Sequence, residues 1–180
     1  MRTLVIYNSQ TGFTRRYAEW IVEELKCDIM PFAEAKRLDF WADYDAIIFG
    51  SWVSAEKIKD IDWLKQNMIK HPAKKYLVYV VGASPAESPM VGEMLKLNML
   101  SEKHSEKCTM VYCPGGLCYE KMSFFNRVVM KIFARMVAKK KDKTEAEAQM
   151  AKMIGQSYDI SDRRYIEPVV RFIRRFEVMD

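Results

Sequence analysis

The sequence predicts a doubly wound α/β fold, a three-layer sandwich in which a five-stranded parallel sheet is covered on both faces by helices. Short apolar, β-branched runs alternate along the chain with longer segments whose apolar residues show helical spacing. Such alternation is typical of βαβ units. The apolar runs are nearly continuous, as expected of strands that are buried on both faces. A hydroxyl-rich loop also follows the first predicted strand, at the position where open α/β sheets bind ligands.

The first third of the chain supplies a β-loop-α-β unit and one further strand. Residues 3–7 (TLVIY) predict a buried strand, and residues 14–26 carry apolar side chains at helical spacing. Residues 27–32 (CDIMPF) predict a short strand, which Pro31 places at an edge of the sheet because proline has no backbone donor. Residues 45–50 (DAIIFG) predict the third strand.

The remainder of the chain continues the alternation. We expect Pro168 to kink the first turns of the last helix, because proline removes a backbone donor. The inward face of that helix is predicted to carry Ile166, Val169, Val170 and Ile173. The predicted elements are a helix over 60–70, a strand over 75–82, a helix over 87–102, a strand over 107–113 and the last helix over 162–177.

Residues 117–158 exceed what a minimal five-stranded domain needs, since connections in compact domains usually have about 2 to 6 residues. We therefore expect one domain over residues 1–180 with residues 117–158 as an insertion. The net charge of +5 is concentrated there, because residues 116–143 hold eight basic and two acidic side chains, a local charge of +6. The rest of the chain is close to neutral.

Within the insertion, residues 124–138 (FFNRVVMKIFARMVA) predict a basic amphipathic helix that begins with Phe124 and Phe125. Three partners could bury its apolar surface: the domain's own core, a second copy in a homodimer, or an anionic membrane surface. All three stay open at this point. No nucleic-acid motif accompanies the charge, so we expect no nucleic-acid partner. The basic residues recur every four positions, at Arg127, Lys131, Arg135 and Lys139.

The chain has no signal-peptide pattern at its first residues and no apolar run of about 18 residues that could span a membrane. We therefore expect a cytoplasmic protein that is at most peripheral on the inner face of the cell membrane. The four cysteines form no CxxC pair, and the two histidines lie far from carboxylate clusters, so no metal site is predicted.

Residues 8–14 are predicted to hold a phosphate. The loop leads from the first strand into the first helix, where free N–H groups and the helix dipole favour an anion. Ser9, Thr11 and Thr14 add hydroxyl groups, and Gly12 lets the chain wrap closely. Neither the P-loop pattern nor GxGxxG is present, which favours a monophosphate over a nucleoside triphosphate or a dinucleotide. The alternative is a turn that only caps a helix.

The stretch S-Q-T-G-F-T (residues 9–14) resembles the phosphate loop of the flavodoxin family. This resemblance implies a flavodoxin-like fold with strand order 2-1-3-4-5 and non-covalently bound FMN. It also implies that the loops after the third and fourth strands bracket the flavin ring, with Trp52 stacked on it. The cofactor-binding residues implied are Ser9, Gln10, Thr11, Gly12, Phe13, Thr14, Ser51, Trp52, Val53, Gly82, Ala83, Ser84, Gly115 and Gly116.

The Gly-Gly-Leu-x-Tyr stretch at residues 115–119, followed by the basic helix, is similar to the flavodoxin-like, menaquinone-dependent protoporphyrinogen oxidases. That resemblance implies a peripheral membrane enzyme of porphyrin biosynthesis, which takes hydrogen from a small-molecule substrate, protoporphyrinogen IX, and passes electrons through FMN to a quinone. No catalytic side chain is then required, because the cofactor carries the redox chemistry. Two alternatives remain: an electron-transfer flavodoxin that docks on a protein partner without small-molecule turnover, and a scaffold that no longer binds flavin.

Overall fold

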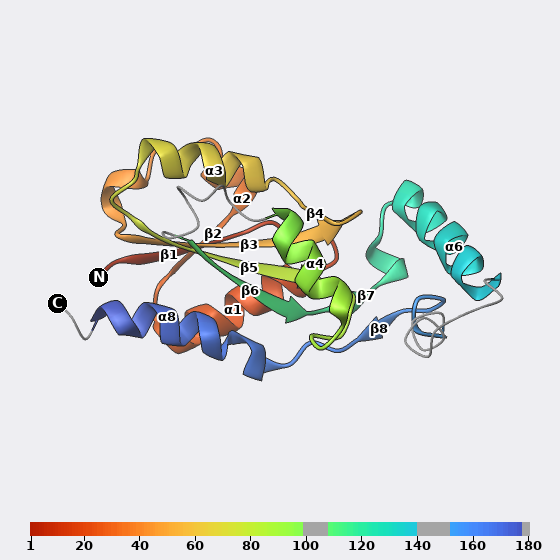
Figure 1. The fold of residues 1–180 in the computed structure, drawn as a ribbon. Coiled ribbons are helices and arrows are strands. Elements are labelled where there is room, and N and C mark those ends of the chain that lie inside the picture. Colours follow the sequence, from red (N-terminus) through yellow and green to blue (C-terminus); the bar gives the residue numbers. More distant parts are fainter. Residues whose placement is uncertain (99–107, 140–151, 178–180) are drawn as a thin grey trace.

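The structure is a computed structural model that describes residues 1–98, 108–139 and 152–177. Figure 1 shows a central sheet with helices on both faces and one helix set apart at the side. The end of the helix predicted over 87–102 lies outside the described residues. So does the basic and acidic run that follows Lys139 in the insertion.

Five parallel strands form the sheet in the order β2-β1-β3-β5-β6, which confirms the predicted fold class and strand order. β2 lies at an edge of the sheet, as the proline in it predicts. A short strand, β4, pairs antiparallel with the end of β3. The strands are β1 (Thr3–Tyr7), β2 (Asp28–Pro31), β3 (Ala46–Ser54), β4 (Lys57–Ile58), β5 (Lys75–Gly82) and β6 (Cys108–Pro114).

The third strand is longer than predicted. β3 runs to Ser54, so Ser51, Trp52 and Val53 belong to the strand and not to a loop after it. Trp52 is paired with Val81 of β5, and Val53 is paired with Ile58 of β4. The predicted end at Gly50 was wrong because the β3–β4 hairpin extends the ladder, and this pairing overrides the glycine as a signal for a strand end.

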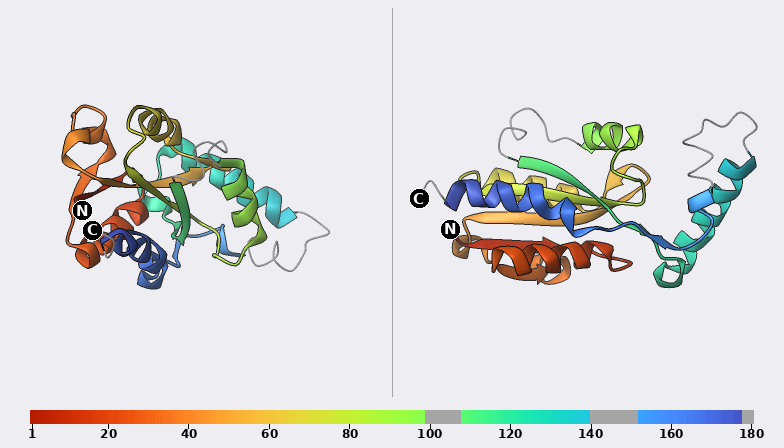
Figure 2. Two further views of the ribbon diagram at one scale, coloured as in Figure 1. Left: turned by 60° about the vertical axis from the view of Figure 1, so that its left-hand side comes forward. Right: turned by 90° about the horizontal axis from the view of Figure 1, so that it is seen from below.

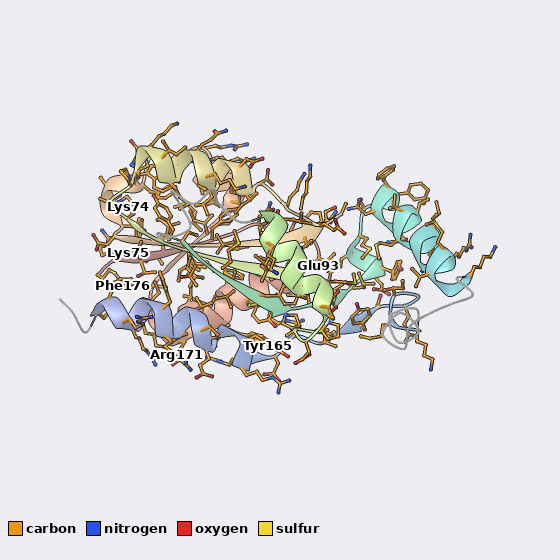
Figure 3. All side chains as sticks on the ribbon, viewed as in Figure 1. Lys74, Lys75, Glu93, Tyr165, Arg171 and Phe176 are labelled. Carbon is orange, nitrogen blue, oxygen red and sulfur yellow. The ribbon has the colours of Figure 1, made fainter. Side chains whose placement is uncertain are left out.

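Each face of the sheet has its own apolar core. On one face α1 and α8 pack against β-strand residues such as Val5 and Ile48, and on the other face α2, α3 and α4 pack against Leu4 and Phe49. Lys75 at the start of β5 places its Nζ 4.8 Å from the centre of the Phe176 ring on α8, at the edge of the sheet away from the ligand-binding ends (Figure 3). The helices are α1 (Phe13–Leu25), α2 (Phe32–Ala35), α3 (Ile61–Lys70), α4 (Pro89–Asn98) and α8 (Glu167–Glu177).

The last predicted helix is divided rather than kinked. Arg163–Ile166 forms a 3₁₀ turn, and α8 then begins at Glu167 with Pro168 in its first turn. Proline is tolerated there because a backbone N–H in the first turn has no partner within the helix. All four predicted inward residues are buried, which confirms the inward face of this helix: Ile166, Val169, Val170 and Ile173.

The insertion begins and ends in a two-stranded antiparallel ladder between β7 (Gly116–Leu117) and β8 (Tyr158–Asp159). Between them, a 3₁₀ turn at Tyr119–Lys121 leads to α6 (Phe124–Lys139), which confirms the helix predicted over 124–138. Apolar side chains of the turn, of α6 and of residue Ile154 form a third, small core. Among the helices that the structure describes, none is long and apolar enough to cross a membrane.

Candidate functional site

The loop after β1 presents free backbone donors at the carboxyl edge of the sheet. Gly12 has φ +102°, in the left-handed region that favours glycine, and its N–H donates to Ser9 Oγ over 3.2 Å. The N–H groups of Ser9, Gln10 and Thr11 have no hydrogen-bond partner in the part of the chain that the structure describes. α1 follows directly, so the positive end of its dipole adds to these donors. The loop is therefore built to receive an anion.

A buried tyrosine of β5 holds the end of this loop through a hydrogen bond to its backbone. The Tyr79 hydroxyl on β5 donates to the backbone carbonyl of Thr14 over 3.1 Å. A Cβ on Gly50 would lie 1.8 Å from the Tyr79 ring, so the glycine that ends the predicted third strand is needed to make room for this ring. Burial raises the pKa of Tyr79 well above its usual value, so the phenol stays protonated and can donate. Thr14 itself is buried.

The loop after β5 is fixed by two more tyrosines. Tyr112 of β6 donates its hydroxyl to the Ser84 carbonyl over 2.8 Å, and its ring occupies the space beside Gly82 that a Cβ would need. Tyr158 of β8 donates to the Ala83 carbonyl over 2.7 Å. Burial raises the pKa of Tyr158 to about 12, so this donor is also neutral at physiological pH. Both hydroxyls hold the backbone of the loop in place.

Gly115 and Gly116 lie where close backbone contacts exclude a side chain. The Gly115 N–H donates to the Gly82 carbonyl over 2.8 Å, and a Cβ there would lie 2.7 Å from Val81. Gly116 has φ +152°, and a Cβ on it would lie 2.1 Å from the Tyr158 carbonyl oxygen. The lack of side chains at the two glycines therefore lets the backbone after β6 pass close to the loop after β5 and to β8.

The three residues predicted to follow the third strand have different surroundings. Ser51 is fully buried, and its hydroxyl donates to the Lys59 carbonyl over 2.7 Å, so this group is already used. Val53 packs against the core under α3 and α4. Trp52 is half-buried, and because successive side chains alternate along a strand, it lies on the α1 face of the sheet, where the first loop also begins.

A cavity of about 220 Å³ lies on the α4 side of this edge. Predicted site residues Val53, Gly82, Ala83 and Ser84 line it together with apolar residues of α4. Two glutamates also line it: Glu56 in the β3–β4 turn and Glu93 on α4, which Figure 3 labels. The sequence analysis missed both, because a lone glutamate in a turn or a helix carries no signal of what it faces. Their charge disfavours an anionic group in this cavity.

Two residues of the insertion contact the first loop, and the sequence analysis did not foresee either contact. The Lys121 Nζ lies 3.9 Å from the position that a Cβ would take on Gly12. The Asn126 side chain of α6 donates from Nδ2 to Gln10 Oε1 over 3.2 Å. Figure 2 shows the turn that carries Lys121 beside the end of this loop. Since these residues are far apart in the sequence, only the fold could bring them together.

The outer surface of α6 is apolar and basic. Phe124 and Phe125 are 83% and 74% exposed. Lys131, Arg135 and Lys139 are also exposed. Arg127 differs from them: it is half-buried, and its guanidinium donates to the Glu120 carbonyl over 3.3 Å. The exposed apolar side chains of α6 are Phe124, Phe125, Val128, Val129, Ile132 and Met136.

The four cysteines are free thiols and are buried or half-buried. Burial raises the pKa of Cys27 to about 11 and that of Cys108 to about 12, so neither thiol ionises at physiological pH. Within the described ranges no three His, Cys, Asp or Glu side chains gather as a metal site would require.

The sequence matches the family model described as a flavodoxin domain over residues 4–145. The chain belongs to the flavodoxin domain family. This membership covers β1 to α6, and so includes both loops at the carboxyl edge and most of the insertion. Among curated proteins, none matches this flavodoxin domain.

Several solved structures resemble this flavodoxin domain. A flavoprotein in complex with FMN from Lactobacillus acidophilus is 17% identical over 63% of this chain and 91% of its own, with a TM-score of 0.42. A flavodoxin from the domain Archaea is 14% identical over 86% of this chain and 94% of its own, with a TM-score of 0.41. The oxidised flavodoxin 1 from Bacillus cereus is 14% identical over 78% of this chain and the whole of its own, with a TM-score of 0.38.

Proposed function

We propose that this chain is an FMN-dependent oxidoreductase. Membership of the flavodoxin family assigns FMN as the cofactor. The observation that supports it most directly is the loop after β1, which combines unpaired N–H groups with the left-handed Gly12 directly before a helix N-terminus. A phosphate there would receive hydrogen bonds from the backbone without a lysine of the P-loop type.

The residues present fit the cofactor. The residues that would hold the phosphate are Ser9, Gln10, Thr11, Gly12, Phe13 and Thr14. The flavin ring would lie between the half-buried Trp52 and the loop of Gly82, Ala83 and Ser84, which tyrosine hydroxyls hold in place. When bound, FMN supplies the electron chemistry, and the protein positions it and controls access to it.

The substrate we propose is protoporphyrinogen IX, with a quinone as electron acceptor. The Gly115–Tyr119 stretch and the basic helix of the insertion support it, because both lie at the same edge of the sheet as the cofactor loops. A substrate with two propionates would be attracted to α6, which exposes Lys131, Arg135 and Lys139, and not to the cavity lined by Glu56 and Glu93. The substrate is therefore expected to approach from the insertion.

The test is an anaerobic reaction of the FMN-loaded protein with protoporphyrinogen IX. Loss of flavin absorbance together with porphyrin fluorescence, followed by recovery of the absorbance when a menaquinone analogue is added, is the expected result. FMN that loads but stays oxidised would contradict the porphyrinogen proposal and favour an electron-transfer flavodoxin that docks on a protein partner. A protein that neither binds FMN nor quenches its fluorescence would contradict the whole proposal and indicate a scaffold without flavin.

We further propose that α6 holds the protein on the anionic inner face of the cell membrane. One side of α6 packs on the small core of the insertion through Met130, Ala134 and Val137. The other side exposes a continuous apolar surface beside Lys131, Arg135 and Lys139, and this combination favours an anionic lipid interface. A helix of this kind lies in the interface and does not cross the bilayer.

Flotation with vesicles tests this proposal, with phosphatidylglycerol-containing and purely zwitterionic vesicles compared. The triple variant Lys131→Glu, Arg135→Glu and Lys139→Glu should lose binding to the anionic vesicles, and Phe124→Ser with Phe125→Ser should lose it too. Arg127 is left unchanged because its guanidinium is held against the Glu120 carbonyl. Equal flotation of all variants, or a dimer in solution that the phenylalanine changes separate, would contradict membrane binding and favour the homodimer.

A further inference from the structure

The two arginines next to the phosphate loop are occupied elsewhere. Arg15 donates to Glu19 over 2.8 Å, one turn further along α1. Arg16 forms an ion pair with Asp159 of β8 and also donates to the Ser161 hydroxyl over 2.7 Å. The loop therefore has hydroxyl and N–H donors but draws no positive charge from the residues that follow it in sequence.

Lys121 brings a positive charge to the same place from the insertion. Its Nζ lies 3.9 Å from the position that a Cβ would take on Gly12, and so occupies the direction in which another residue would project its side chain. Among the described residues, no carboxylate forms an ion pair with Lys121. The neighbouring carboxylate of Glu120 accepts hydrogen bonds from the Ser157 hydroxyl, over 2.8 Å, and from the Cys118 thiol. The ammonium group is therefore available to a ligand.

The position of Lys121 is set by contacts on both sides of it. The 3₁₀ turn is anchored before it, where the Tyr119 N–H donates to Ser157 Oγ over 3.0 Å and the Tyr119 hydroxyl donates to the Ile154 carbonyl over 2.5 Å. After it, the Asn126 amide contacts Gln10 of the loop. Of these two side chains from the insertion, Lys121 is the cation.

We infer that Lys121 binds the phosphate of FMN from the open side of the loop and supplies the positive charge that the loop lacks. This inference rests on the proposed FMN function. A lysine ammonium is a compact charge with three donors and a flexible stem, so it can close on a phosphate that the loop has already received. The insertion would then serve the cofactor as well as a membrane surface.

The test compares FMN with riboflavin, which has the same ring and no phosphate, by fluorescence titration of the apoprotein. Lys121→Met should weaken FMN binding by about 10- to 100-fold, as expected for a hydrogen bond to a charged group, and leave riboflavin binding unchanged. Lys121→Arg should keep most of the FMN affinity. The FMN affinity of Lys121→Met should also depend less on salt concentration, because one ionic contact is missing.

Lys70→Met is the matched control, since it removes the same charge from the exposed end of α3, near the start of β5 and away from the phosphate loop, and should leave both affinities unchanged. Equal FMN affinity of Lys121→Met and wild type would overturn the inference, and so would an equal loss for FMN and riboflavin. If the wild-type protein itself binds no FMN, the proposed function fails first. Because Lys121 is exposed, thermal unfolding of Lys121→Met should match that of wild type.

Discussion

At Gly116 the backbone conformation and the available space both require glycine. The residue has φ +152°, and any Cβ would lie 2.1 Å from the Tyr158 carbonyl oxygen in the partner strand of the ladder. Gly116→Ala should lower the free energy of unfolding by about 2 kcal/mol or more, because backbone and not a flexible side chain must move. Urea unfolding measures this effect.

Gly92→Ala provides the contrast, because nothing lies within 4 Å of the Cβ position in the middle of α4. This change should raise the free energy of unfolding by about 0.5–1 kcal/mol, since alanine restricts the unfolded chain and favours the helix. A Gly116→Ala variant as stable as the wild type would show that the insertion ladder tolerates a side chain there.

Single residues differ in how far the sequence reveals their role. Gly12 and the hydroxyls around it stand in one short stretch between a strand and a helix, so local pattern is enough to predict an anion site. Lys121 and Tyr79 act on the same loop from distant parts of the chain. Their positions depend on the register of the sheet and on the path of the insertion, neither of which has a local signature.

In the β3–β4 hairpin, the two turn residues are of types that disfavour the backbone conformation of the turn. Ala55 and Glu56 both have positive φ, of 47° and 64°, as a two-residue type I′ turn requires, although neither side chain favours that conformation. The Asn98 side chain of α4 holds the hairpin, accepting from the Ile58 N–H over 2.9 Å and donating to the Glu56 carbonyl over 2.6 Å. Local strain is thus balanced by a buried amide.

Replacing both turn residues, Ala55→Asn with Glu56→Gly, should raise the free energy of unfolding by about 1 kcal/mol, because Asn-Gly is suited to the left-handed region. Asn98→Ala should lower it by about 2 kcal/mol, since it leaves buried backbone groups unpaired. Both values are accessible by chemical denaturation. A turn replacement that destabilises the protein would mean that the strain is not located in these two residues.

This hairpin also explains the largest error in the sequence analysis of elements. Gly50 looks like the end of a strand, but the glycine is there because the Tyr79 ring needs the space beside it. The chain continues in the sheet for four more residues because β4 pairs with this extension. The other four strands of the parallel sheet, β1, β2, β5 and β6, follow the predicted runs within one residue at each end, since a run of apolar residues is a continuous signal. Pairing with the two-residue strand β4 leaves no such signal in the sequence.

At the scale of the whole molecule, buried phenols and thiols make stability sensitive to high pH. Burial raises the pKa of Cys27 from 9.0 to about 11, and it raises the pKa values of Tyr17, Tyr76 and Tyr79 above 10. The folded state favours the protonated groups, so their contribution to stability is complete below the unfolded pKa values and is lost as pH rises through the folded ones.

Urea midpoints should therefore change little between about pH 7 and about pH 8 and should fall from about pH 9 upwards, more steeply above pH 10, where each such tyrosine adds up to about 1.4 kcal/mol per pH unit. Midpoints that stay level through pH 11 would contradict this account.

The fold as a whole could be read from the sequence because its signals are local and repeated: each strand is an apolar run, and each helix has its own apolar face. The candidate site could be read only in part. Its first loop is a continuous motif, but the carboxylates Glu56 and Glu93 reach the cavity from separate elements. Contacts of that kind depend on the packing of α4 against the β3–β4 hairpin.

The ladder between β7 and β8 places the two ends of the insertion side by side, with Leu117 directly opposite Tyr158. A tight turn could therefore join these two residues, and the excised chain would keep every strand of the main sheet and both of its cores. The insertion could therefore be removed from this domain or transferred to another one. Inserted between paired strands of another flavodoxin domain, it would carry Lys121, its small core and α6 as one unit.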